Sequence, residues 1–457
     1  MSNKRVVLIF PDGVGIKNYL YSDVFKNTDT ELIILHNFDD ETQKLLSEIT
    51  SVTEFYKIPK YIESFKEKFL RELICLSRLK YNSKIADNAT ILSNWKTDHK
   101  GLSKKVFYKL ISKLSTKTTD YKSILKLEKA YQKSLRNTDF YNQVKNLFSE
   151  INPDLVFCAH QRGLQCATIF AVAEDQNISN ATVIYSWDNL PKARMALKAD
   201  KYLVWSVNMK DEMHLYYPEI SSEQVVVSGT PQFEFYGDSS NITPKDEFYK
   251  RYELDVDRKI ICFSGDDTKT SPDDPKYLFD LASEMSRNNL QNEYQILLRR
   301  CPVDFSGRFN GVIKQFPNLI KEAAPIWSVN STNVWSTVFA LPDDIALLVS
   351  TAFYSDIVVN VGSTMAFDFA MFKKPCVFIA YDQEIKVESS WSVDTIYKFQ
   401  HFRTMPNNKA VIWWTKKDQI TNIIKAAKYV PETDTWMDTV LGDYKHSSSL
   451  IADTLKL

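Results

Sequence analysis

The sequence predicts an α/β protein made of two doubly wound domains, each with a mostly parallel sheet, that face one another across a cleft. Short apolar runs rich in β-branched residues alternate with helix-length segments along most of the chain, which is the pattern of βαβ units. The chain has 457 residues, enough for two or three domains of about 100–200 residues each.

The first domain is expected to span residues 1–236. It begins with a strand at 4–10, and a helix is expected from Lys17. Further strands of this domain are expected at 31–36, 154–159, 181–185, 201–205 and 224–228. Between about residues 40 and 150 the sequence becomes rich in Lys, Leu and Glu, with apolar residues at helical spacing. We therefore expect a helical subdomain inserted into the first domain.

A polar stretch at 237–257 predicts a linker that leads to a second α/β domain at 258–425. The strands of this second domain are expected at 259–263, 294–298, 325–327, 357–361 and 376–380. The remaining residues, 426–457, are expected to form a C-terminal helical segment.

Composition excludes several classes of protein. Lys plus Arg and Asp plus Glu both number 57, whereas nucleic-acid-binding proteins usually carry a basic excess. The six cysteines form no CxxC pair, which favours buried, reduced thiols over a disulfide framework or a zinc site. The sequence shows no apolar signal region and no run of about 18–20 apolar residues. We therefore expect a soluble, cytoplasmic protein that binds no nucleic acid.

The stretch from Asp356 to Asp382 is the most informative part of the chain. It reads as a buried strand, a tight turn at Gly362, Ser363 and Thr364, a helix, and a second buried strand. Free backbone N–H groups at the helix start and two hydroxyls would point at one spot, which suits an anion such as phosphate. The alternative is an ordinary strand-to-helix turn in which Ser363 or Thr364 caps the helix.

Ligands of open α/β sheets bind beyond the carboxyl ends of the strands, so polar residues in those loops are candidates for a site. Asp12 follows the first strand, and Gly13 and Gly15 in the same loop would let a ligand approach the backbone closely. The third glycine of the dinucleotide fingerprint is missing, so NAD is not expected. Asp12 is a candidate general base, or else it forms the turn or caps the following helix.

Two further loops of the first domain are rich in polar side chains. His160 and Arg162 directly follow a buried strand, and together they could bind or protonate an anionic group. The next such loop contains Trp187, Asp188 and Asn189. A Trp can stack on a sugar face while Asp and Asn bind its hydroxyls. The alternatives are a structural histidine and an ordered loop with a buried Trp.

Two loops of the second domain could bind a phosphate-bearing ligand. Gly265 ends the first strand of this domain with a flexible backbone, and Arg300 follows the next strand. An Arg at that position can pair with a diphosphate or a carboxylate, although it is also commonly a surface residue. No metal is required by this arrangement, but the acidic pairs at 266–267 and 273–274 leave a divalent ion open.

Four motifs occur in an order and spacing that one group of enzymes shares. They are Val227-Ser-Gly-Thr-Pro231, the loop 186–190, Arg300-Cys-Pro302, and the segment from Val361-Gly-Ser-Thr364 through Asp368 and Lys374-Pro375 to Tyr381-Asp382. In these motifs, between about residues 154 and 400, the chain resembles the GT-B glycosyltransferases, which have two Rossmann-like domains. The specific resemblance is to bacterial enzymes of surface-carbohydrate assembly, including the CDP-glycerol glycerophosphotransferase-like group.

The resemblance implies a nucleotide-sugar donor in the second domain and a glycan, lipid-linked or protein acceptor in the first. The donor residues would be Gly265, Arg300, Gly362, Ser363, Thr364 and Asp368, and the acceptor residues Gly13, Gly15, Arg162, Trp187 and Asn189. The implied activity is a metal-independent, inverting glycosyl transfer in synthesis of a surface polymer such as capsule or lipopolysaccharide. The candidates for the residue that takes the acceptor proton are Asp12, Asp188 and His160.

Two departures from the polyol-phosphate transferases favour sugar transfer. Trp187-Asp188-Asn189 stands where those enzymes have a Trp-His-Gly-Thr-Pro-like loop, and Cys301 stands where relatives have the His of Arg-x-His-Pro. The alternatives are a non-hydrolysing UDP-sugar 2-epimerase that uses His160 with Asp12 or Asp188, a CDP-polyol phosphotransferase, and a silent scaffold that binds sugar nucleotides.

The segment 57–80 combines Lys and Arg residues with apolar residues such as Phe65, Phe69 and Leu73 at helical spacing. Such a helix could lie on the inner face of the membrane, where a lipid-linked acceptor would be found. The alternative is a solvated face of a helix that packs on the first domain.

Overall fold

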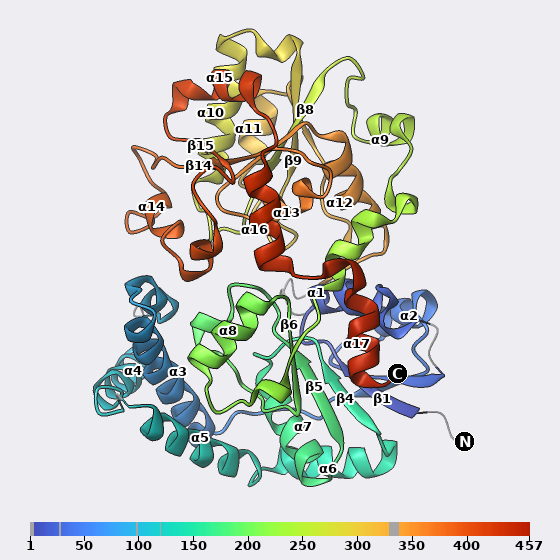
Figure 1. Cartoon of the computed structure of the whole chain (residues 1–457), viewed down its shortest axis with the longest axis vertical. Helices are drawn as coiled ribbons and strands as arrows, with labels where there is room; N and C mark the ends of the chain where they lie inside the picture. Colours follow the sequence, from blue (N-terminus) through green and yellow to red (C-terminus); the bar gives the residue numbers. More distant parts are fainter. Residues whose placement is uncertain (1–3, 27–28, 97–98, 119, 329–337) are drawn as a thin grey trace. The chain divides into compact units, whose positions relative to one another are not determined.

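The computed structural model describes residues 4–26, 29–96, 99–118, 120–328 and 338–457. The chain forms two compact units, which we describe separately. Unit 1 comprises residues 1–231, 399–401 and 440–457, and unit 2 comprises 232–398 and 402–439. Each unit contains its own parallel β-sheet with helices around it (Figure 1), which confirms the predicted α/β class.

The sheet of unit 1 has seven parallel strands in the order β3-β2-β1-β4-β5-β6-β7. Their bounds are β1 Lys4–Ile9, β2 Thr30–His36, β3 Glu54–Lys57, β4 Leu155–Cys158, β5 Ser179–Val183, β6 Lys201–Val204 and β7 Val225–Val227. Six of them lie within two residues of the predicted positions. The sequence analysis missed β3, which lies inside the stretch expected to be helical and pairs with β2 at the sheet edge.

The described α-helices of unit 1 include a layer of three beside the sheet, α3, α4 and α5 (Figure 1). The bounds in this unit are α1 Gly13–Gly15, α2 Asp40–Ile49, α3 Phe65–Ile85, α4 Leu102–Leu114, α5 Tyr121–Leu135, α6 Asp139–Ile151, α7 Leu164–Asp175, α8 Val207–Tyr216 and α17 Ser447–Leu455. The helix expected from Lys17 begins earlier, at Gly13, and continues as a π-helical turn at Ile16–Leu20.

Helix α3 lies in the interior of this layer. Its residues Leu70 and Ile74 pack against Tyr131 and Leu135 of α5 and Ala167 of α7. A capping box fixes its start, because Ser64 accepts a hydrogen bond from the Glu67 amide and Glu67 returns one to the Ser64 amide. Buried apolar contact on several sides therefore holds this helix.

The expected basic surface helix at 57–80 is not what the structure shows. The helix starts only at Phe65, and two of its basic residues are turned inward. Arg78 is almost fully buried between Glu128 and Glu219, and Arg71 pairs with Glu63. Sequence spacing did not reveal this because the carboxylates that neutralise Arg78 come from distant segments.

The sheet of unit 2 has six parallel strands in the order β10-β9-β8-β13-β14-β15. Their bounds are β8 Lys259–Ser264, β9 Tyr294–Arg299, β10 Ile320–Glu322, β13 Ile357–Asn360, β14 Cys376–Ile379 and β15 Ile412–Trp414. The strand expected at 325–327 is wrong for this sheet. Its place is taken by β10, and Trp327 begins the two-residue strand β11 (Trp327–Ser328), which pairs antiparallel with β12 (Phe339–Ala340).

The described α-helices of unit 2 connect and cover these strands. Their bounds are α9 Lys245–Arg251, α10 Asp274–Arg287, α11 Asn310–Gln315, α12 Asp343–Tyr354, α13 Met365–Ala370, α14 Val393–Ile396, α15 Ile420–Ala426 and α16 Pro431–Leu441, whose last two residues belong to unit 1. Helix α9 lies within the stretch expected to be a linker. Its residues Phe248 and Tyr249 are buried in a core cluster of unit 2 with Ile260 and Leu297, so this part of the chain belongs to the unit itself.

The C-terminal segment of the chain returns to unit 1. The Lys4 ammonium donates to the Leu455 carbonyl oxygen at 2.7 Å. Gly229 has φ +70°, and a Cβ there would lie 2.2 Å from the Ser447 hydroxyl. Only glycine therefore fits where the chain approaches α17.

The two sheets share one topological feature that positions the candidate site. In each sheet the first strand has later strands on both sides, so the connections leave in opposite directions from it. This switch point lies between β1 and β4 in unit 1, and between β8 and β13 in unit 2. A crevice opens at such a point at the carboxyl ends of the strands, and ligands of open α/β sheets bind there.

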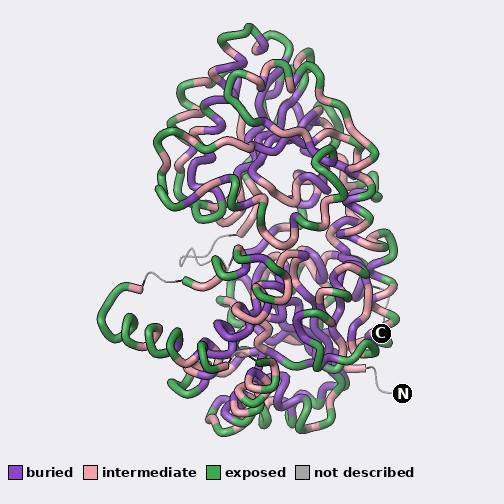
Figure 2. The backbone as a smooth tube through the Cα atoms, turned by 60° about the vertical axis from the view of Figure 1, so that its left-hand side comes forward, coloured by how far each residue is buried: buried purple, intermediate pink, exposed green. Residues whose placement is uncertain are grey.

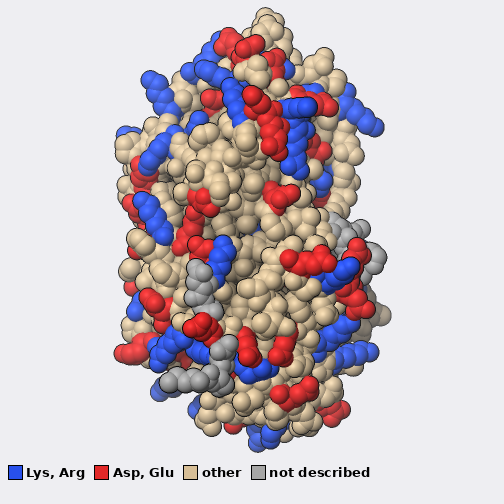
Figure 3. Space-filling model, turned by 90° about the vertical axis from the view of Figure 1, so that its right-hand side faces the viewer, with Lys and Arg blue, Asp and Glu red and all other residues tan. Residues whose placement is uncertain are grey.

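Burial and charge follow the usual pattern of a globular α/β protein. The strands form buried cores (Figure 2). On the face that Figure 3 shows, Lys and Arg lie among Asp and Glu, in keeping with their equal totals of 57. Within the described residues, no helix is both long and apolar enough to cross a membrane.

Candidate active site

The switch point of unit 1 brings Asp12 and His160 into direct contact. Asp12 follows β1 and caps α1, because its Oδ1 accepts a hydrogen bond from the Gly15 amide at 3.0 Å. Its Oδ2 lies 2.6 Å from Nδ1 of His160, which follows β4. Asp12 is 1% exposed and His160 3% exposed. The expected helix cap is thus present, and the same carboxylate contacts His160.

The contacts of His160 define its protonation state. Arg162 donates from Nε to Nε2 of His160 at 2.9 Å, and a guanidinium can only donate. Nε2 must therefore be the unprotonated nitrogen, and Nδ1 carries the hydrogen that points to Asp12. Burial lowers the pKa of His160, against the effect of Asp12. The ring, which stacks on Tyr185 with centroids 4.2 Å apart, is thus neutral and can accept a proton.

The two glycines of the first loop serve packing. Gly13 and Gly15 are both buried within α1. A Cβ on Gly15 would lie 2.9 Å from the Cβ of Ala159 and 3.3 Å from Phe10. Gly15 therefore lets α1 approach the end of β4, and ligand binding at this loop stays a prediction.

The loop after β5 is an internally bonded polar cluster. Asp188 forms an ion pair with Lys192 and accepts a hydrogen bond from the Asn189 side chain at 2.7 Å. Asn189 in turn accepts from Gln161 at 3.1 Å. Burial alone would raise the pKa of Asp188, but Lys192 and His401 outweigh it and hold this pKa well below its usual range. Asp188 is consequently a weak base.

Trp187 differs from the expectation that it stacks on a sugar. It is 5% exposed, and its ring meets His401 edge-on with centroids 4.6 Å apart. His401 belongs to the short segment 399–401 that is part of unit 1. The alternative of a structured loop with a buried Trp therefore describes the molecule.

Sequence reasoning missed two titratable residues near this loop. Burial lowers the pKa of His401 to about 4, and burial followed by the charge of Asp188 raises the pKa of Glu212 to about 8. Glu212 is on α8, and His401 is more than two hundred positions from Asp188 in the sequence. No local pattern connects either residue to the loop, so only the fold could bring them together.

A cavity of about 260 Å³ lies within unit 1 between the helical layer and the extended segment 193–200. Arg162 is one of its lining residues, so the cavity and His160 share a neighbour. Arg194, which also lines it, is 35% exposed and lies 4.0 Å from Glu72. Leu164 and Leu197 form an apolar part of its wall. The cavity thus offers guanidinium groups beside hydrocarbon, and the carboxylates of Glu128, Glu174, Asp200 and Glu219 also line it.

At the switch point of unit 2, the predicted turn is present and partly exposed. Gly362 has φ +67°, and a Cβ there would lie 2.8 Å from the ring of Phe402, so this position requires glycine. Asn360 accepts a hydrogen bond from the Ser363 amide at 2.8 Å, and the Ser363 hydroxyl accepts from the Met365 amide at 3.4 Å. Part of the donor capacity expected here is therefore used within the turn, and Thr364 stands directly before α13.

Gly265 and Asp368 have contacts within the unit. A Cβ on Gly265 would lie 2.7 Å from the ring of Phe309, so this glycine lets the aromatic ring pack. Asp368 accepts a hydrogen bond from the Tyr236 hydroxyl at 2.5 Å and is 9% exposed. Both residues thus have architectural contacts, and their expected role in holding the donor stays a prediction.

The two arginines at the end of β9, Arg299 and Arg300, are each paired with a carboxylate. Arg300 donates to Glu322 at 2.6 Å and to the Asp304 carbonyl oxygen at 2.9 Å, and about a third of this ion pair is exposed. Arg299 is buried, and its Nη2 donates to both carboxylate oxygens of Asp344 at 2.8 and 3.0 Å. Arg300 must exchange Glu322 for a phosphate if it is to bind one.

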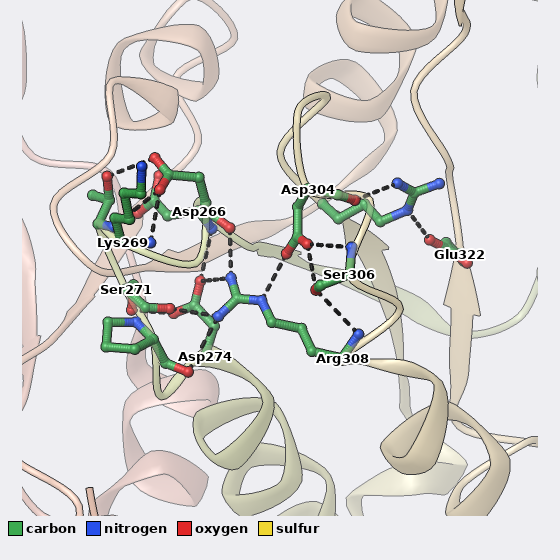
Figure 4. A network of polar contacts seen from close by, with 12 residues as sticks. Asp266, Lys269, Ser271, Asp274, Asp304, Ser306, Arg308 and Glu322 are labelled. Atoms are coloured by element: carbon green, nitrogen blue, oxygen red, sulfur yellow. Dashed lines mark hydrogen bonds and ion pairs between the residues drawn. The ribbon is translucent and has the colours of Figure 1, made fainter. Parts of the chain in front are cut away.

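Arg308 joins the loops after β8 and β9 (Figure 4). It donates to Asp304 at 2.6 Å, to the carbonyl oxygens of Asp266 and Ser271 at 2.6 and 2.7 Å, and lies 3.6 Å from Asp274. Burial raises the pKa of Asp274 to about 6, and burial followed by Asp274 raises the pKa of Asp266. The two loops are therefore fixed by one partly buried cation, Arg308, that sequence analysis did not single out.

No cluster of three or more His, Cys, Asp or Glu side chains in the described segments is arranged to hold a metal ion. The described cysteines are all free thiols, and five of the six are buried.

Comparison with known proteins adds information on the fold. No protein-family model matches the chain. A curated teichoic acid poly(ribitol-phosphate) polymerase from Bacillus spizizenii is 22% identical over 296 residues, which make up 64% of this chain and 41% of the polymerase. The matched region thus spans about two fifths of that relative.

Solved structures match over nearly the whole chain. The UDP-GlcNAc 2-epimerase from Methanocaldococcus jannaschii aligns with a TM-score of 0.53 and 10% identity, over 99% of this chain and 100% of the epimerase. The co-structure of S. aureus MnaA with UDP aligns with a TM-score of 0.50 and 11% identity, over 99% and 96% of the two chains. At such identities the likeness concerns the fold. The chain has the GT-B-like fold, with two parallel α/β units, that the UDP-GlcNAc 2-epimerases also have.

Proposed function

We propose that this protein is a glycosyltransferase that moves a sugar from a nucleotide-sugar donor to an acceptor hydroxyl in the synthesis of a surface polymer. The observation that carries the proposal is the neutral His160, held between Asp12 and Arg162 at the switch point of unit 1. An imidazole with an unprotonated Nε2 and an oriented Nδ1–H is suited to general-base catalysis.

In the proposed reaction, Nε2 of His160 takes the proton of the acceptor hydroxyl. The acceptor must displace Arg162 from Nε2, after which the guanidinium is free to bind an anionic group of the acceptor. The acceptor oxygen forms a bond to the anomeric carbon, the bond from that carbon to the donor phosphate breaks, and the nucleoside diphosphate leaves. Asp12 orients the ring and stabilises the imidazolium as it forms.

The other two candidates are less suited to act as the base. Both Oδ atoms of Asp12 have hydrogen-bond partners. The pKa of Asp188 lies well below its usual range because of Lys192 and His401, so this carboxylate has little affinity for a proton. We therefore assign proton transfer to His160 and positioning to Asp12.

We propose that the donor phosphates bind at the switch point of unit 2. The turn at Gly362, Ser363 and Thr364 is half-exposed and begins a helix, and backbone N–H groups at such a position stabilise a leaving phosphate. Arg300 would contribute once it leaves Glu322.

We propose that the cavity of unit 1 binds the acceptor. Arg162 and Arg194 favour an acceptor that carries a phosphate or carboxylate, and Leu164 and Leu197 favour one with an apolar portion. A lipid-linked acceptor has both features.

The similarity to a teichoic acid poly(ribitol-phosphate) polymerase favours a second candidate, transfer of a polyol phosphate from a CDP-polyol. His160 would again take the acceptor proton, but the oxygen would attack phosphorus, and CMP would leave. The residues at the two switch points fit either leaving group.

A panel of nucleotides tests the proposal. Thermal-shift measurements with UDP-, CMP-, CDP-, GDP- and dTDP-sugars and with CDP-polyols should identify one donor, since a ligand at 100 times its Kd adds about 2.7 kcal/mol of stability. With that donor and an acceptor, release of nucleoside diphosphate from an NDP-sugar, or of CMP from a CMP-sugar, indicates sugar transfer. Release of CMP from a CDP-polyol indicates polyol-phosphate transfer. Formation of an epimer without an acceptor would identify an epimerase instead, and turnover of no donor would contradict all three activities.

A further inference from the structure

We propose that α4 is a docking helix for the surface of an anionic phospholipid membrane. This inference concerns a part of unit 1 that has no role in the proposed chemistry, and it does not depend on the proposed function.

An apolar stripe on α4 faces solvent. Leu102, Val106 and Leu110 are 83%, 67% and 44% exposed. They are four residues apart, so they lie along one side of the helix. Figure 2, which turns this side forward, shows most of the α4 backbone as exposed.

Phe65, at the start of α3, extends the stripe. It is 72% exposed, and its ring contacts that of Phe107 on α4 with centroids 5.7 Å apart. Large exposed apolar side chains that adjoin one another mark an interaction surface more strongly than single ones do.

A second stripe on α4 is basic. Lys105, Lys109 and Lys113 are exposed and are also four residues apart, so they run beside the apolar stripe. Residues 99–118 contain six lysines and no Asp or Glu, although the whole chain has zero net charge. The positive charge of this segment is therefore local.

The remaining side of α4 is anchored to the protein. Ile111 is fully buried against Leu73 and Leu76 of α3, and Phe107 and Leu114 pack on the same cluster. The outward stripes are thus held in place by the fold, while their own side chains contribute little to its core.

The combination of stripes identifies the partner. An anionic membrane accepts aliphatic side chains between its lipids and lysine ammonium groups among its phosphates. A nucleic acid would match the lysines but would leave three aliphatic side chains without a partner. A second copy packed through α4 would bring the four lysines of one α4 toward the four lysines of the other. The membrane is the partner that satisfies both stripes.

Vesicle flotation tests this proposal. The full chain should bind vesicles made of equal parts phosphatidylglycerol and phosphatidylcholine, and should fail to bind vesicles of phosphatidylcholine alone. The triple variants Leu102→Gln/Val106→Gln/Leu110→Gln and Lys105→Gln/Lys109→Gln/Lys113→Gln should each weaken binding at least about tenfold. Added salt should weaken the binding of the unaltered chain, because ions screen the lysine charges.

Matched variants on unit 2 control for general loss of charge or apolar surface. Lys250→Gln/Lys314→Gln/Lys425→Gln removes three exposed lysines, and Val256→Gln/Ile385→Gln/Val387→Gln removes three exposed aliphatic side chains. Both should bind vesicles like the unaltered chain. Absence of vesicle binding, equal binding to neutral vesicles, or equal loss in the controls would overturn the proposal. So would concentration-dependent dimerisation that the α4 variants abolish, since it would assign this face to a second copy.

Discussion

The two switch points have the same topology and different chemistry. In unit 1, the loops after β1 and β4 place Asp12, His160 and Arg162 in a buried chain of hydrogen bonds around a neutral imidazole. In unit 2, the loops after β8 and β13 present a half-exposed turn at Gly362 and Thr364. The nearby charges there already neutralise one another. Under the proposed function, the same strand order builds an edge for proton transfer in one unit and an edge for anion binding in the other.

The sharpest test of this difference is removal of the proposed base. His160→Gln keeps the size and polarity of the side chain but removes its ability to take a proton. We expect turnover to fall about 10²- to 10⁴-fold, the usual contribution of a general base, with donor affinity unchanged. Steady-state kinetics and calorimetric titration of the donor measure the two effects separately.

Asp12 has two roles, and a matched variant separates them. Asp39 caps α2 as Asp12 caps α1, through a hydrogen bond from the Thr42 amide at 2.8 Å. Asp39 follows β2 and is not at the switch point between β1 and β4. Asp12→Asn and Asp39→Asn should both keep their helix caps, because Asn caps a helix about as well as Asp does. Only Asp12→Asn should lower turnover. Equal activities of the two variants would reduce Asp12 to a helix cap.

The loops of unit 2 should depend on Arg308 more than on Arg300. Arg308→Met leaves Asp304 buried without its partner, which typically costs about 3–5 kcal/mol. Arg300→Met breaks a partly exposed pair with Glu322, which is worth about 0–1 kcal/mol. Chemical denaturation measures both. If Arg300→Met is the more destabilising variant, Arg308 is not the residue that holds the loops after β8 and β9 together.

The turn of unit 2 should respond to loss of its hydroxyls. We expect Ser363→Ala/Thr364→Ala to lower turnover about 10-fold or more, if each lost contact is worth about 1–2 kcal/mol. Both hydroxyls can donate to a phosphate, because the hydrogen bond that the Ser363 hydroxyl accepts from the Met365 amide does not use its own hydrogen. Kinetics of the single variants divide the effect between them, and unchanged turnover of the double variant would remove the phosphate assignment.

The pH profile should show the smallest effect. Burial lowers the pKa of His160 below its ordinary value of 6.5, so kcat/KM should be level near neutral pH and fall as the pH drops through that lowered pKa. Asp12 raises this pKa and Arg162 lowers it. The acid limb should therefore move to lower pH in Asp12→Asn and to higher pH in Arg162→Gln. If kcat/KM falls at the same acidic pH in all three proteins, His160 is not the group whose protonation controls the reaction.

Local sequence patterns predicted the parallel sheets well because buried β-branched runs and glycine turns are local signals. They predicted the residues that follow the strands, including Asp12, His160 and the turn at Gly362. They failed where a role depends on distant partners. The contact of His401 with Trp187 and the burial of Arg78 among distant carboxylates are examples. The packing contacts of Gly15 and Gly265 could not be predicted either, because a close approach of packed side chains and a ligand site both call for glycine.

The central claim is that unit 1 carries out proton transfer while unit 2 holds the donor. Single-turnover rates and donor Kd values of His160→Gln and Thr364→Ala, measured side by side with the donor found in the thermal-shift panel, test it most directly. The account predicts a slow chemical step with normal donor affinity for His160→Gln, and weakened donor affinity for Thr364→Ala. Loss of donor affinity in His160→Gln, together with normal affinity in Thr364→Ala, would contradict it.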